Sequence, residues 1–297
     1  MKYLQTISVL MLPIIISACA GSSSSSSSTS TTVTPSATTF TSWSTYTAGT
    51  AVGFTEGSTS AINASGNIAQ SDSAGSATLT LDGGGTATAI SATNGSTTIN
   101  MSTSNGDTLV SGFGGATTLA LNKSQTTMAV FANPTNSGYE YQTFGAWGAY
   151  GNGGASGAIS VGNVTPLTGL PTSGTGAFVG GSSGYYIDPS NNAFLVNASM
   201  TVNVDFAGRV ATFSTSNSAM TGGPAGSAIG NSNLNLAGNL SYGAGSTNLS
   251  GTVTSTSGMT GPANGKFYGP VANEIGGTYA VSGSGLGSMV GGFGGKR

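Results

Sequence analysis

The chain has 297 residues, of which only 5% are charged; 6 Lys and Arg stand against 8 Asp and Glu, with 50 Gly, 1 Cys and no His. The lack of His and the single Cys exclude Ser-His-Asp and Cys-His catalysis, zinc sites built on Cys or His, and His-ligated haem. The carboxylates are spread singly and no basic run occurs, so the sequence predicts a non-enzymatic protein that holds no cofactor or metal and binds no nucleic acid.

The N-terminus predicts the compartment. Lys2 precedes an apolar run from Ile7 to Ile16, and Ser17-Ala18-Cys19 follows it. This pattern is typical of a bacterial lipoprotein signal peptide over residues 1–18, because the run is too short to span a bilayer and small residues precede the cleavage site. We expect Cys19 to carry the lipid that anchors the chain to the membrane. Ala20, in place of an acidic retention residue, is similar to lipoproteins exported to the outer membrane, so we expect an outer-membrane, surface-exposed chain.

Residues 19–39 follow as a tract of Ser and Thr that includes seven consecutive serines, Ser22 to Ser28. Such a tract has no apolar surface to bury and should stay solvated. We expect a tether that holds the folded part away from the membrane.

Residues 40–135 contain short segments of strand character separated by turn signals. Examples are Ala77–Leu81, Thr86–Ala92 and Thr97–Met101, which precede Asp-Gly or Asn-Gly pairs that suit tight hairpins. Alternation is weak, with Ala and Thr at many core positions. The pattern predicts a small β domain with a modest core, ending near Asn133-Pro134.

Residues 136–297 are predicted to form about eight antiparallel strands, beginning with Tyr141–Trp147. The clearest pair spans Ala193 to Thr215, where Met200, Val202, Val204 and Phe206 alternate with polar residues. Leu234–Tyr242 and Asn248–Thr254 predict a second pair, and the glycine run from Gly261 to Gly265 is expected to be a turn before the closing strands. An eight-stranded barrel has an interior that side chains fill or that holds one small ligand. The predicted fold class is all-β, a small N-terminal β domain followed by an antiparallel β-barrel.

Several of these segments resemble the surface lipoproteins of the transferrin-binding protein B family, including its shorter solute-binding relatives. The resemblance is carried by YQTFGAW at 141–147, LPTSGTGAFVG at 170–180, TVNVDFAGRVATFS at 201–214 and the closing run 261–297 with FYGP, NEIGG and GFGGKR. It implies a "handle" domain at 40–135, a barrel at 136–297 and a first barrel strand at 141–147. Family members bind iron-carrying host proteins, haem or complement regulators. Only framework motifs match here, and the chain has room for one handle and one barrel, which makes transferrin itself doubtful.

Four residues stand out as candidate partner contacts: Phe178, Tyr185, Tyr186 and Glu274. Tyr is favoured at protein contacts, but the Tyr185-Tyr186 pair could equally cap a barrel end. Glu274 could face a partner or accept hydrogen bonds from backbone near a hairpin tip. The predicted function is binding of a host protein or a nutrient ligand, of the iron-carrier or haem acquisition class. The alternative is a structural or adhesive surface-coat lipoprotein, which the nearly uncharged composition also fits.

Overall fold

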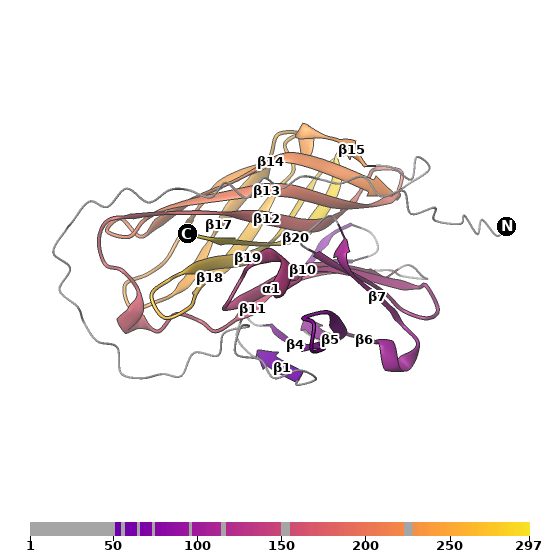
Figure 1. Cartoon of the computed structure of the whole chain (residues 1–297). Helices are drawn as coiled ribbons and strands as arrows, with labels where there is room; N and C mark the ends of the chain where they lie inside the picture. Colours follow the sequence, from indigo (N-terminus) through magenta and orange to yellow (C-terminus); the bar gives the residue numbers. More distant parts are fainter. Residues whose placement is uncertain are drawn as a thin grey trace.

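The computed structural model describes residues 51–54, 57–63, 66–72, 75–94, 97–113, 117–149, 155–222 and 228–297. The predicted signal peptide, Cys19 and the tether lie outside these residues. Nearly all described elements are strands, arranged as a barrel with two smaller sheets beside it (Figure 1). Within the described residues, no helix is long and apolar enough to cross a bilayer.

Eight antiparallel strands close into the barrel. In spatial order, with β13 pairing back onto β14, they are β13 (Ala193–Asp205), β12 (Thr175–Ile187), β20 (Gly287–Lys296), β19 (Glu274–Gly283), β18 (Thr260–Tyr268), β17 (Asn248–Ser255), β16 (Leu236–Ser241) and β14 (Val210–Gly222). The two-residue strand β15 (Ile229–Gly230) pairs with the end of β14. The predicted eight-stranded antiparallel barrel is therefore confirmed.

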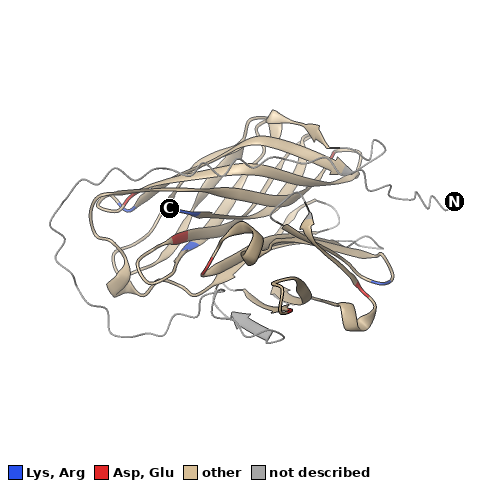
Figure 2. Cartoon of the chain, viewed as in Figure 1, with Lys and Arg blue, Asp and Glu red and all other residues tan. Residues whose placement is uncertain are grey.

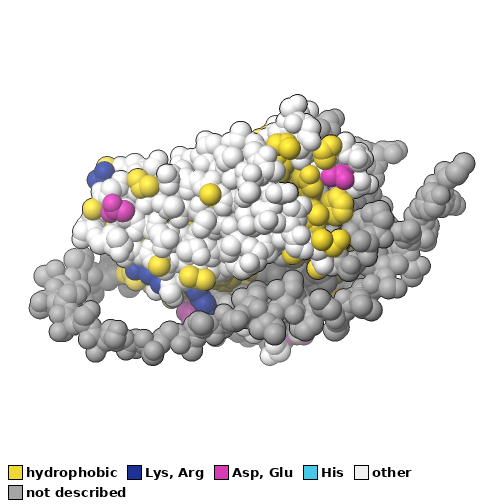
Figure 3. Space-filling view, turned by 90° about the horizontal axis from the view of Figure 1, so that it is seen from above, with side chains coloured by type: hydrophobic (Ala, Val, Ile, Leu, Met, Phe, Trp, Pro, Cys, Tyr) yellow, Lys and Arg dark blue, Asp and Glu magenta, His cyan; other side chains and the backbone are white. Residues whose placement is uncertain are grey.

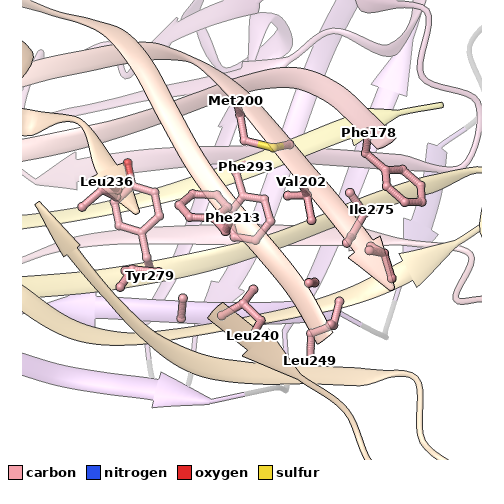
Figure 4. Packing of buried hydrophobic residues seen from close by; sticks show 14 of the residues in the cluster. Phe178, Met200, Val202, Phe213, Leu236, Leu240, Leu249, Ile275, Tyr279 and Phe293 are labelled. Atoms are coloured by element: carbon pink, nitrogen blue, oxygen red, sulfur yellow. The ribbon is translucent and has the colours of Figure 1, made fainter. Parts of the chain in front are cut away.

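Side chains fill the barrel interior. Successive residues of a strand point to opposite faces, so one set of alternating residues on each strand points inward. On β13 and β14 this set includes Met200, Val202, Val204, Ala211 and Phe213. Phe213 and Phe293 meet at the centre with ring centroids 4.7 Å apart, and Figure 4 shows aliphatic and aromatic side chains from most strands converging around them. The interior is therefore a core of contacting apolar and aromatic side chains.

Two further sheets form a β-sandwich, here called the handle sandwich. The seven-stranded sheet has the order β3 (Ile68–Asp72), β2 (Gly57–Ile62), β11 (Ser156–Gly162), β10 (Gln142–Ala149), β9 (Thr127–Ala132), β8 (Thr117–Leu121) and β7 (Thr108–Phe113). The four-stranded sheet has the order β1 (Ala51–Phe54), β4 (Ser76–Leu81), β5 (Ala87–Asn94) and β6 (Thr97–Ser102). Leu79, Ile90 and Met101 of the smaller sheet pack against Phe131 and Trp147 of the larger one.

The helical elements of the described residues are single turns that connect strands. They are η2 (Thr103–Asn105), α1 (Pro134–Ser137), η3 (Leu167–Gly169) and η5 (Ser232–Leu234). In α1 the side chain of Asn133 accepts a hydrogen bond from the Thr135 N–H, Pro134 starts the turn, and Gly138 ends it at φ 67°. Asn, Pro and Gly are favoured at these positions at the start and end of a helix. The turn α1 connects β9 to β10.

Two sequence expectations need correction. Residues 141–147 do not form the first barrel strand: β10 pairs with β9 and β11 in the handle sandwich, and the barrel begins at β12. The run Gly261–Gly265 is not a turn but part of β18, paired with β17 and β19. Glycine suits this place because a Cβ on Gly261 would lie 2.1 Å from the Ala280 carbonyl oxygen.

The free face of the seven-stranded sheet packs on β12, β19 and β20 of the barrel. Ile62, Val130 and Ala158 contact Tyr185 and Val290 there. The two backbones come close at Gly292, where a Cβ would lie 2.7 Å from the Gly145 carbonyl oxygen. Polar groups in this interface are mostly paired, as in the 3.0 Å hydrogen bond from the Ser60 hydroxyl to the Thr278 hydroxyl. The close backbone approach and these bonds join sandwich and barrel firmly.

Candidate functional site

Phe178 lies in the barrel core. Its side chain has no exposed surface, and its ring centroid is 6.3 Å from that of Phe267. The Arg297 guanidinium covers this end of the core, 5.2 Å above the Phe178 ring and 5.1 Å above the Phe206 ring. Burial lowers the pKa of Arg297, but an Arg remains charged at neutral pH. Phe178 therefore stabilises the barrel end and offers no surface to a partner.

The adjacent tyrosines differ in their environments, because neighbouring residues of a strand point to opposite faces. Tyr185 points outward into the handle sandwich, is fully buried, and donates its hydroxyl to the Met128 carbonyl at 3.2 Å. Tyr186 points to the barrel interior near its rim and donates to the Leu286 carbonyl at 2.8 Å. Partial burial, then the nearby Asp188 charge, raise the pKa of Tyr186, so its hydroxyl stays protonated. Tyr185 joins the two parts, and only Tyr186 approaches the surface.

Glu274 is buried between the barrel and the handle sandwich. Its carboxylate accepts the N–H of Glu140 at 2.6 Å and the N–H of Tyr141 at 3.2 Å. The acceptor role foreseen for Glu274 is present, but the donors belong to the segment before β10 and not to its own hairpin tip. With 3% of its surface exposed, Glu274 cannot reach a partner.

Partly exposed apolar side chains gather at the barrel end that carries β15, here called the β15 end. Tyr186 stacks on Phe194 with centroids 6.2 Å apart, and Met220 and Leu286 pack against the barrel core beside them. Ile229 on β15 pairs with Met220 and is 50% exposed. Figure 3 shows hydrophobic side chains collected over this end of the barrel, next to a wide face with few of them.

The outer face of the barrel, unlike the β15 end, carries mostly polar, uncharged side chains. The registers place its outward side chains in three rows across β12, β13, β14, β16, β17 and β18, here called the barrel wall. The rows are Thr175, Asp205, Val210, Ser241, Ser250, Asn264; Ala177, Asn203, Thr212, Asn239, Thr252, Pro262; and Val179, Thr201, Ser214, Ala237, Thr254, Thr260. Most carry a hydroxyl or an amide, and Asp205 is the only charge in the three rows. Charged residues of the described chain lie mainly near strand ends (Figure 2).

One part of the barrel wall is hollowed. A shallow depression of about 380 Å³ lies over β12, β13 and β14, at the end away from β15. Its rim consists of Thr175, Asp205 and Val210 from the first row and Ala177, Asn203 and Thr212 from the second row. Gly176 and Val204 lie beneath them. The Asp205 Oδ1 accepts the N–H groups of Ala207 and Gly208, both at 3.0 Å, which fixes the adjoining turn.

The β15 end and the barrel wall offer apolar contacts and hydrogen-bonding groups. Among the described residues, no three His, Cys, Asp or Glu side chains come together in a way that could hold a metal ion. The sequence reasoning named Tyr186 as a candidate contact but missed the other residues of the β15 end and the barrel wall. The alternation of Thr201, Asn203 and Asp205 with inward Val202 and Val204 was the signal for the wall. Because the apolar rim of the β15 end is assembled from four separate strands, it had no local signal.

A closed eight-stranded antiparallel barrel with a β-sandwich packed on one side defines the class of this protein. Residues 170–297 match the family model described as the C-lobe and N-lobe β-barrels of transferrin-binding protein B. The barrel belongs to this transferrin-binding protein B-like family. A comparison with curated proteins found no match.

Several solved structures match part of this chain at low sequence identity. A transferrin-binding protein B variant from Haemophilus parasuis is 15% identical, with a TM-score of 0.49 over 80% of this chain and 44% of that one. Transferrin-binding protein B from Neisseria meningitidis is 14% identical, with a TM-score of 0.46 over 82% and 43%. The N-lobe of lactoferrin-binding protein B from Moraxella bovis is 11% identical, with a TM-score of 0.35 over 53% and 76%. The chain thus spans less than half the length of the two transferrin-binding structures.

Proposed function

We propose that this chain is a lipid-anchored protein of the outer-membrane surface that binds a host protein or a nutrient carrier without catalysis. The observation that carries the proposal is the packed barrel. Since side chains from most strands fill the interior, a ligand must bind on the outside, where macromolecules bind more readily than small solutes. The family match supports the class of partner, because members are named for binding transferrin, an iron carrier.

The β15 end is the surface that best suits such a partner. Interface centres are enriched in Tyr, Phe and Met, and these residue types meet there as Tyr186, Phe194 and Met220. Ile229 adds an exposed aliphatic side chain at the edge. The Asp188 carboxylate accepts the N–H of Asn192 at 2.7 Å and its side-chain amide at 2.9 Å, which orders the neighbouring turn. A rigid apolar centre with a polar rim matches the general anatomy of a protein interface.

Capture from host fluid tests this proposal. The mature chain, immobilised through its N-terminus, is exposed to serum and separately to iron-loaded and iron-free transferrin and lactoferrin, and bound proteins are identified by mass spectrometry. We expect one saturable protein partner, and we expect Ile229→Lys to weaken it at least tenfold. Val271→Lys is the matched control, because Val271 is 45% exposed at the opposite barrel end. Equal loss in both variants, or no retained protein at all, would contradict the proposal.

A further inference from the structure

The depression in the barrel wall has a regular construction. Cross-strand neighbours in a sheet lie about 4.5–5.5 Å apart, and residues two apart on one strand about 7 Å. Strand pairing sets Asn203 between Ala177 and Thr212, and Asp205 between Thr175 and Val210. The rim is thus a grid of two rows on three strands. Its volume of about 380 Å³ lies within the range of roughly 300–1,000 Å³ typical of small-ligand sites.

The polar groups on this grid are free to bind. The side chains of Thr175, Asn203 and Thr212 form no hydrogen bond with another described residue. Each hydroxyl offers a donor and an acceptor, and the amide of Asn203 offers two donors and an acceptor. Asp205 accepts its turn hydrogen bonds through Oδ1, so Oδ2 can accept from a ligand. Ala177 and Val210 supply small apolar surfaces between these groups.

The composition of the wall selects the class of ligand. Basic residues are absent from its three rows, which disfavours nucleic acid and sulfated or sialylated polymers. Aromatic side chains, Met and Arg are absent too, although these dominate the energetics of protein interfaces. A neutral polyhydroxylated ligand matches an uncharged grid of donors and acceptors, and a carboxylate strengthens hydrogen bonds from sugar hydroxyls.

We infer that the wall depression, at Thr175, Asn203, Asp205 and Thr212, is a binding site for a neutral saccharide. One or two sugar rings lie across β12, β13 and β14, with hydroxyl groups bound to Asn203 and Thr212 and a further hydroxyl donated to Asp205. The adjoining rows of Ser, Thr and Asn let a longer neutral glycan continue along the wall. This site is separate from the β15 end, so one chain can hold a protein partner and a glycan at once.

A glycan array tests the inference with the full mature chain. The array carries neutral glucans, mannans and galactans beside sialylated and sulfated glycans, and binders are confirmed by calorimetry. We expect retention on neutral glycans only, and we expect Asn203→Ala to lower affinity at least tenfold. Asn239→Ala is the matched control: Asn239 is exposed in the same row, but lies outside the depression on β16. Thermal melts check that both variants fold alike.

Each outcome decides the matter. Retention on anionic glycans alone, no retention on any glycan, or equal loss in the Asn203 and Asn239 variants would overturn the inference. Ile229→Lys should leave glycan binding unchanged. A failure of glycan binding with intact capture of a host protein would therefore remove this site without affecting the proposed function.

Discussion

The Glu274 carboxylate accepts the Glu140 N–H at 2.6 Å across the boundary between barrel and handle sandwich. Glu274 starts β19, whereas Glu140 lies two residues before the start of β10. With the second bond, from Tyr141 at 3.2 Å, one side chain satisfies two consecutive backbone donors. Tyr139 adds a hydrogen bond from its hydroxyl to the Gly294 carbonyl at 2.7 Å. The segment between α1 and β10 of the handle sandwich is therefore held on the barrel by these three hydrogen bonds.

Glu274→Ala should destabilise this connection. The change leaves two partly buried N–H groups without their acceptor, and each orphaned group costs about 1–3 kcal/mol. We expect a loss of roughly 2–4 kcal/mol in the free energy of unfolding, measured by urea denaturation. Glu140→Ala is the control, because the Glu140 side chain is exposed and the bond uses only its backbone. If both variants lose the same stability, the bonds to Glu274 do not hold the segment.

The same carboxylate predicts a pH dependence. Burial raises the pKa of Glu274 from 4.5 to about 7, partly offset by the N–H groups of Glu140 and Tyr141; the Glu140 charge raises it further and Lys296 lowers it. The folded chain therefore holds this proton more tightly than the unfolded chain. The contribution to stability is complete below about pH 4.5 and is lost as pH rises to about 7. Its size is about 3 kcal/mol at most.

Denaturation series at pH 5, 6, 7 and 8 measure this slope. We expect the free energy of unfolding to fall across the range in the wild type and to fall less in Glu274→Gln, which cannot titrate. An identical slope in the two proteins would assign the pH dependence to other groups.

Gly292→Ala tests the close packing of the two parts. A Cβ there would lie 2.7 Å from the Gly145 carbonyl oxygen and 2.9 Å from the Ile159 carbonyl oxygen, and backbone cannot rotate away as a side chain can. Such overpacking costs about 1–3 kcal/mol. Gly243→Ala is the matched control, because no atom lies within 4 Å of its Cβ position. Thermal melts should show a lower Tm for Gly292→Ala alone; an unchanged Tm would mean that the sheets can separate at little cost.

Strand positions could be predicted from the sequence, but sheet membership could not. Alternation from Met200 to Phe206 predicts β13 and its inward face, and both are present. In β10, by contrast, Phe144 and Trp147 are buried on opposite faces, so its pattern fits a strand of either sheet. Alternation along β12 likewise places Tyr185 on the outer face of the barrel. No local pattern, however, indicates that the handle sandwich covers that face. Contacts between distant segments decide both cases.

Haem should bind weakly. Without His, iron would be held by Met or by a deprotonated Tyr. Burial raises the pKa of Tyr279 to about 12, partly offset by a hydrogen bond with Ser182. Burial also raises the pKa of Tyr139, and Phe178 and Tyr185 have no surface with which to sandwich a porphyrin. Titration with haemin should give a shallow, unsaturable change in the Soret band, the same in Tyr186→Ala. A tight one-to-one complex with a sharp low-spin spectrum would contradict this prediction.

The last prediction concerns the membrane anchor, which rests on residues outside the described part of the chain. Lys2, the apolar run and Ser17-Ala18-Cys19 predict cleavage before Cys19 and its acylation. Because stable anchoring needs more than one acyl chain, a mature N-terminal Cys with several chains should keep the protein in the membrane fraction. Cys19→Ser should abolish acylation and release or stall the chain, measured by fractionation and by mass spectrometry of the N-terminal peptide. Ser22→Ala, in the tether, should behave as the wild type. If Cys19→Ser were processed and retained normally, the protein would be held at the membrane by some other means.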